Sequence, residues 1–132
     1  MAVVLDSFAL IAYFRGEEQG VPVAEMLEKA GKQDRALHMC EVNYAEVKYM
    51  CLRKDGKAAW EKVAQVLVAL PIEFHAADRE LADHAADFKS RFTMSLADGF
   101  AAALSRKLKA ELVTGDPEFK ALEGEIKIKW LK

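Results

Sequence analysis

The fold prediction depends most on the segment MAVVLDSF, residues 1–8. This segment is a short apolar run with β-branched residues at Val3 and Val4, and a helical pattern follows it at once, which is typical of a buried central strand in a parallel sheet. Asp6 then lies at the carboxyl end of the strand. Ligands and reactive groups gather at this edge of open α/β sheets, because strand ends and helix starts converge there. The question is whether other acidic side chains reach the same edge.

The composition is that of one ordinary domain, which we expect to span residues 1–132. Hydrophobic residues make up 52% of the chain and charged residues 30%, enough for a core of its own. The net charge of −2 argues against binding nucleic acid by bulk electrostatics, but not against a nuclease, because a bound metal ion supplies positive charge. Cys40 and Cys51 lack zinc-site spacing and are too few for a disulfide framework. With neither a signal-like start nor a membrane-length apolar window, we expect a cytoplasmic protein.

Strands and helices are predicted to alternate along the rest of the chain. Further strands are expected at residues 35–40, 72–74, 112–114 and, as an edge strand, 126–131. Helices are expected at residues 7–14, 17–32, 43–54, 57–70, 78–92 and 95–108, with a short one ending near residue 122. Gly16 and Gly31 are interpreted as the residues that end the first two helices. This alternation predicts an α/β domain with a mainly parallel sheet.

Four acidic residues lie at predicted strand-to-helix junctions, and each also has a local explanation. Asp6 can cap the helix that follows it, and Asp116 can do the same ahead of a proline. The segments Asn43–Glu46 and Ser95–Asp98 both fit the reciprocal capping pattern at a helix start. Glu41 competes with Glu46 for the same position near the sheet. Capping alone therefore accounts for any one of these carboxylates.

The four junctions together favour a metal site. If the strands are parallel, all four open on one edge, and carboxylates held that close raise one another's pKa unless a cation neutralises them. Carboxylate oxygens suit Mg²⁺ or Mn²⁺, and such a site can hydrolyse phosphodiesters through an activated water. Gly99 is interpreted as leaving space beside Asp98. The basic side chains that could form a rim for a phosphate backbone are Arg15, Lys48, Lys89, Arg91, Lys107 and Lys109.

Other motifs give no competing site. The three histidines do not form a zinc pattern and are interpreted as surface or strand-end residues; they are His38, His75 and His84. No GxxxxGK[ST] loop for nucleoside triphosphates and no GxGxxG loop for dinucleotides is present. An aspartyl-phosphate transferase that used Asp6 as nucleophile fits poorly, because Phe8 occupies the position of the second aspartate.

The ordered set of acidic blocks resembles a known family. The blocks are Leu5–Ser7, Tyr44–Val47, Ser95–Ala103 and Val113–Phe119, and together they resemble the four acidic blocks of PIN domains. Their order, spacing and total length are similar to those of the small single-domain VapC toxins of VapBC toxin–antitoxin systems. No single block is specific, but the ordered set is, and the resemblance spans nearly the whole chain.

The resemblance implies a three-layer α/β/α sandwich and a Mg²⁺- or Mn²⁺-dependent endoribonuclease. The catalytic and metal-binding residues would be Asp6, Glu46, Asp98 and Asp116. The aspartates would hold the metal, and Glu46 would bind it through water or orient the attacking water. Thr114 would be a polar helper, and a role for Glu118 is left open. The implied partners are an RNA substrate, a cognate VapB-type antitoxin that inserts near the metal site, and a second copy of the chain in a homodimer.

Two alternative functions stay open at this point. One is a housekeeping PIN-domain nuclease that matures RNA and has no antitoxin. The other is a non-catalytic module that keeps its carboxylates for capping and binds a protein partner. Homodimer formation also has support from apolar helix residues that exceed the needs of the core, which are Phe8, Tyr13, Phe14, Tyr49, Met50 and Leu52.

Overall fold

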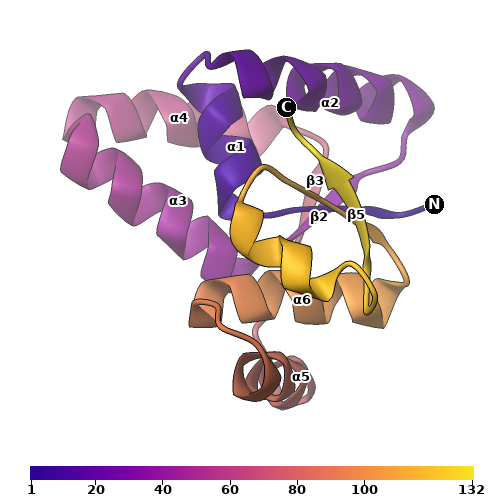
Figure 1. The fold of residues 1–132 in the computed structure, drawn as a ribbon. Coiled ribbons are helices and arrows are strands. Elements are labelled where there is room, and N and C mark those ends of the chain that lie inside the picture. The colour runs from indigo at the N-terminus through magenta and orange to yellow at the C-terminus, as the bar shows by residue number, and fades with distance from the viewer.

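A central sheet of five strands organises the molecule, which is described over residues 1–132 by a computed structural model (Figure 1). The strand order is β3-β2-β1-β4-β5, and every neighbouring pair is parallel. The strands are β1 (Val3–Leu5), β2 (Leu37–Cys40), β3 (Ile72–His75), β4 (Glu111–Thr114) and β5 (Lys127–Trp130). The predicted α/β fold with a mainly parallel sheet is therefore confirmed, and the sheet is parallel throughout.

Helices cover both faces of this sheet. Figure 1 shows α5 and α6 on one side and the first four helices on the other, so the molecule has the expected three layers. The helices are α1 (Ser7–Phe14), α2 (Val21–Gln33), α3 (Glu41–Lys54), α4 (Lys57–Ala69), α5 (Arg79–Arg91) and α6 (Leu96–Leu108), with short 3₁₀ helices η1 (Glu18–Gly20) and η2 (Pro117–Leu122). None of the helices is long and apolar enough to cross a membrane.

The central position of β1 follows from its side chains. Val4 and Leu5 are completely buried, and successive residues point to opposite faces of the sheet. Val4 packs in the core under α5 and α6, whereas Leu5 packs in the core under the first four helices. A strand that is buried on both faces needs a continuous apolar run, and this is why the first strand could be predicted from so few residues.

The layer of α5 and α6 packs closely because of a glycine. A Cβ atom added at Gly99 would lie 3.0 Å from the backbone oxygen of Ala85, on α5. The expectation that Gly99 leaves space beside the Asp98 carboxylate is therefore wrong, because the missing side chain makes room for the neighbouring helix. This close contact fixes the first turn of α6, which carries Asp98, against α5.

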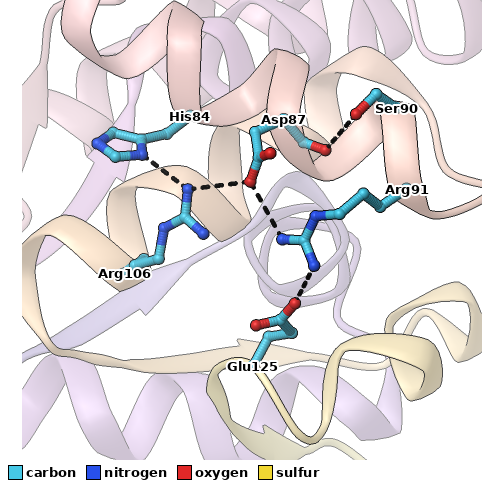
Figure 2. Close-up of polar contacts among 6 residues, drawn as sticks. All are labelled: His84, Asp87, Ser90, Arg91, Arg106 and Glu125. Atoms are coloured by element: carbon cyan, nitrogen blue, oxygen red, sulfur yellow. Dashed lines mark hydrogen bonds and ion pairs between the residues drawn. The ribbon is translucent and has the colours of Figure 1, made fainter.

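A polar network joins α5, α6 and the segment before β5 (Figure 2). Arg106 donates to His84 Nδ1 at 2.7 Å and lies 3.5 Å from Asp87, both on α5. Arg91 contacts Asp87 at 3.1 Å and also pairs with Glu125. The hydrogen bond from Arg91 is the main reason why the pKa of Asp87 is lowered. Exposed pairs of this kind add little stability, so the network chiefly sets alignment.

Both ends of the second helix differ from the prediction. The second helix begins at Val21, after η1, and continues through Gly31 to Gln33, where Asp34 adopts the left-handed conformation with φ 52°. Gly31 is therefore not its last residue. Gly16 does follow the end of α1 with φ 67°, as expected.

Helix α3 begins two residues earlier than predicted. Cys40 is both the last residue of β2 and the N-cap of α3, so the chain passes from strand to helix at Glu41 without a loop. Asn43 is consequently inside the helix rather than its cap, and the capping-box interpretation of Asn43–Glu46 is wrong. The last strand agrees with the prediction of an edge strand, because Lys127 and Lys129 are exposed.

Candidate active site and metal centre

Asp6 follows β1 directly and is the N-cap of α1. Its carboxylate accepts a hydrogen bond of 2.9 Å from the backbone N–H of Ala9, so the capping role is real. The side chain is only 1% exposed, and this burial raises its pKa to about 7. Hydrogen bonds from Thr114 and Ala9 oppose the increase, and the charges of Asp98 and Asp116 add to it. A cap alone does not require a carboxylate to be buried beside two others.

Asp98 lies in the first turn of α6, where the expected cap is present. Its backbone N–H donates to Ser95 Oγ at 3.1 Å. Ser95 also hydrogen-bonds to the Asp98 side chain, which partly offsets the increase in the pKa of Asp98 that burial causes. Asp98 is 7% exposed, and its pKa is raised to about 7, first by burial and then by the charge of Asp116. The charges of Glu46 and Glu118 act in the same direction.

Asp116 and Glu118 complete a tight acidic group with Asp98. Asp116 caps η2 by accepting the backbone N–H of Glu118 at 2.9 Å, and its own N–H donates to Thr114 Oγ1 at 3.0 Å. One carboxylate oxygen from each of Asp98, Asp116 and Glu118 lies within 4.8 Å of the other two. Glu118, whose role the sequence left open, therefore lies in the cluster.

Glu46 reaches the site from α3. It is the sixth residue of the helix, one turn further from the sheet than predicted, and its carboxylate accepts a hydrogen bond from the Ser7 hydroxyl on α1. Its competitor Glu41 is exposed and does not line the cavity described below. Asn43, which is fully buried, donates to the backbone oxygen of Ala97 at 3.0 Å and so ties α3 to the first turn of α6.

These carboxylates line one cavity of about 690 Å³ at the carboxyl edge of the sheet. The acidic side chains that line it are Asp6, Glu17, Glu46, Asp98, Asp116 and Glu118. Arg15 and Lys54 lie on its wall, so one of the predicted basic residues is at the site and Lys54 is an additional one. The remaining predicted basic residues, which do not line it, are Lys48, Lys89, Arg91, Lys107 and Lys109.

The donor set fits a hard divalent cation. Asp6, Asp98 and Asp116 form no ion pair within 4.0 Å with any lysine, arginine or histidine, although two of them are almost fully buried. Buried like charges without a counter-ion are unfavourable, and an oxygen-bound cation removes the penalty. Oxygen donors without sulfur or imidazole favour Mg²⁺ or Mn²⁺.

Comparisons with known proteins agree with this arrangement. The family model described as the PIN domain matches residues 3–125. The chain belongs to the PIN domain family. Among solved structures, DNA-bound VapBC from Salmonella typhimurium contains a chain with 15% identity and a TM-score of 0.77, covering 100% of this PIN chain and 99% of the other. A search among curated proteins gave no match.

Two further structures share the fold. VapBC2 from Rickettsia felis, bound to a DNA fragment from its promoter, has a chain with 13% identity and a TM-score of 0.75, with complete coverage of both chains. VapC20 from Mycobacterium tuberculosis, described as a sarcin–ricin loop cleaving toxin, has 16% identity and a TM-score of 0.69, covering 91% of this PIN domain and 94% of that chain. At these identities the likeness is one of fold.

Sequence reasoning missed several residues around the site. Ser7 was grouped with Asp6 only as a possible cap, whereas its hydroxyl holds Glu46. Lys54 gave no signal beyond its charge, because its approach to the cavity depends on the direction of α3. The histidines were interpreted as surface or strand-end residues, and His75 is indeed the last residue of β3. The contact between His38 and His75 beside Glu73, on neighbouring strands, was not predicted.

Proposed function

We propose that this PIN domain is a metal-dependent endoribonuclease that hydrolyses RNA phosphodiester bonds. The observation that carries the proposal is the convergence in one cavity of carboxylates from Glu46 on α3, Asp98 on α6 and the N-caps of α1 and η2, where the aspartates form no ion pair with a basic side chain. Asp6, Asp98 and Asp116 would hold the ion, with Glu118 as an additional oxygen donor. When bound, Mg²⁺ or Mn²⁺ supplies Lewis acidity toward the phosphate and lowers the pKa of water.

The remaining groups of the site have roles that follow from their contacts. Glu46 is held by the Ser7 hydroxyl, so one of its oxygens stays available to accept a proton from the attacking water or to bind through water. Lys54 provides positive charge on the wall of the cavity, where a phosphate backbone would pass. Arg15 lies on the same wall, and its guanidinium also pairs with Asp55 at 3.0 Å. Thr114 bonds to Asp6 and to the Asp116 backbone, and so positions two of the metal-binding carboxylates.

We further propose that the chain is a VapC-type toxin with a cognate VapB-type antitoxin. Structures with the same fold over nearly the full chain come from VapBC complexes, and one is described as a sarcin–ricin loop cleaving toxin. Growth arrest on expression, relieved by co-expression of a small gene encoded beside this one, would support the assignment. Active cleavage of RNA without growth arrest would favour a housekeeping PIN nuclease instead.

The test of catalysis is RNA cleavage in Mn²⁺. Wild-type protein should cleave, and Asp6→Asn should lose at least about 100-fold of the activity, a typical cost of removing a group that stabilises reacting charge. Asp83→Asn is the matched control, because Asp83 is an exposed carboxylate on α5 that does not line the cavity. Equal activity in wild type and Asp6→Asn would refute the nuclease proposal. If calorimetry also showed no Mn²⁺ binding, a non-catalytic protein-binding module would be favoured.

A further inference from the structure

A second cluster of metal-binding side chains lies on β2 and β3, away from the acidic cavity. The two strands pair in parallel register, with His38 opposite Glu73 and Cys40 opposite His75. Residues two apart on a strand point to the same face, so His38, Glu73 and His75 share one face of the sheet. One donor atom from each of the three lies within 4.8 Å of the other two. None of the three lines the acidic cavity.

The distances among the donor atoms match those around a tetrahedral ion. His38 Nδ1 lies 2.9 Å from His75 Nε2 and 3.6 Å from Glu73 Oε2. Ligands bound at about 2.0–2.1 Å in tetrahedral geometry are about 3.3 Å apart, and the two observed distances lie on either side of this value. Side-chain shifts of a few tenths of an ångström, for which the exposed Glu73 has freedom, would place all three around one ion.

The protonation state and access of the cluster also suit a metal. The two imidazoles are in hydrogen-bond contact, which requires that at least one ring nitrogen carry a free lone pair. Burial, together with the charge of His75, lowers the pKa of His38 and so favours the neutral ring. The His38 side chain is 18% exposed and that of Glu73 60%, and His38 also lines a separate cavity of about 530 Å³. An ion can therefore enter from solvent.

We propose that His38, Glu73 and His75 form a binding site for Zn²⁺, which joins the edge strand β3 to β2. Two imidazoles and one carboxylate favour Zn²⁺ over Mg²⁺, whereas the acidic cavity, with oxygen donors alone, has the opposite preference. Three protein ligands leave a fourth position for water. The site does not depend on the nuclease activity, because it shares no residue with the acidic cavity. Its occupancy should stabilise the fold, since an ion that binds only the folded state raises the melting temperature.

The experiment is a calorimetric titration of the full chain with Zn²⁺ in excess Mg²⁺, on four matched proteins. Wild type and the double variant Asp98→Asn/Asp116→Asn should both bind one equivalent of Zn²⁺, because the acidic cavity is not involved. His75→Ala should bind at least about tenfold more weakly. His84→Ala is the control and should bind as wild type does, since His84 contacts Arg106 on α6 and lies outside the cluster. Histidine side-chain NMR signals should show Zn²⁺-dependent shifts of His38 and His75 but not of His84.

The outcomes separate the proposal from its alternatives. If wild type does not bind Zn²⁺, or if His75→Ala binds it as tightly as wild type, the site does not exist. If Zn²⁺ binding is lost in the double aspartate variant, the ion occupies the acidic cavity and the proposal is wrong. If circular dichroism shows that His75→Ala is unfolded, the Zn²⁺ affinity of Glu73→Gln tests the site instead. The Glu73 side chain is mostly exposed, so its substitution leaves the core intact. Unchanged Zn²⁺ affinity in Glu73→Gln would overturn the three-ligand site.

Discussion

The two polar clusters of this PIN domain differ in how the charges of their side chains are compensated. At the carboxyl edge of the sheet, Asp6 and Asp98 are buried among other carboxylates with no basic partner, and both pKa values are raised to about 7. On β2 and β3, by contrast, His38 and His75 contact one another beside Glu73, and burial lowers the pKa of His38. The first cluster gathers several carboxylates whose charges are not offset until a cation binds, whereas the second has one carboxylate beside two imidazoles. In the metal-free protein, repulsion between buried charges should therefore lower the stability at the acidic edge and not at the histidine cluster.

The largest expected effect separates activity from stability at that edge. Asp98→Asn should lower RNA cleavage by at least about 100-fold, because one of the metal-binding oxygens is lost. The same change should raise the stability of metal-free protein above pH 7 by roughly 1–3 kcal/mol, because a buried charge among like charges is removed. Cleavage assays and urea denaturation in a chelator measure the two effects. A loss of stability in Asp98→Asn would mean that the buried charge of Asp98 does not destabilise the metal-free protein.

Stability without metal should depend on pH in a direction that the acidic edge determines. Asp6 and Asp98 titrate near 3.8 when unfolded and near 7 when folded, so the folded chain holds more protons between these values. The stability that these two groups contribute should therefore be fully present below about pH 4 and should be lost as the pH rises to about 7, by on the order of a few kcal/mol for the coupled pair. Mn²⁺ should remove most of this decline. A metal-free melting temperature that rises between pH 5 and pH 7 would contradict the account.

A smaller effect concerns the contact that holds the two sides of the acidic cavity together. Asn43→Ala should cost about 0.5–1.5 kcal/mol, because the hydrogen bond from the Asn43 amide to the backbone oxygen of Ala97 is lost. The first turn of α6 should then be less well placed, and Mn²⁺ affinity should fall with stability. Ser90→Ala, which removes an exposed hydroxyl bonded to a backbone oxygen, should cost under about 0.5 kcal/mol. Denaturant titrations compare the two, and equal costs would mean that Asn43 has no bridging role.

The smallest effect is expected at Ser7, whose hydroxyl donates a hydrogen bond to Glu46. Ser7→Ala should reduce RNA cleavage by roughly tenfold or less, since one hydrogen bond that orients Glu46 is worth about 1 kcal/mol. Mn²⁺ affinity should change little, because the aspartates keep their positions. If Ser7→Ala lowered Mn²⁺ affinity as strongly as Asp98→Asn, then Glu46 would be a direct metal ligand. Mn²⁺ calorimetry with both variants distinguishes these cases.

The acidic edge could be predicted from sequence because each of its aspartates follows directly from local structure. Strand β1 is a continuous apolar run, and Ser95 is a clear helix cap, so Asp6 and Asp98 were placed without knowledge of the tertiary fold. The parallel sheet then brings them together. The position of Glu46 in its helix was wrong because β2 passes into α3 without a loop, and no turn residue marks that boundary.

The histidine cluster could not be predicted in the same way. His38 and His75 are far apart in the chain, and their contact depends on the register between β2 and β3, which no local pattern specifies. Gly99 illustrates the same limit, since its purpose is a close approach to Ala85 on another helix. Local capping and strand patterns are visible in a sequence, but the pairing of distant faces is not.

The most direct test of the account is a calorimetric titration of the purified PIN domain with Mn²⁺ at pH 7.5. We predict that the wild-type chain binds Mn²⁺, that Asp83→Asn binds it with unchanged affinity, and that the double variant Asp6→Asn/Asp98→Asn does not bind it at the acidic cavity. Failure of the wild-type chain to bind Mn²⁺, or equal binding by the double variant, would contradict the claim that these buried carboxylates form a cation site.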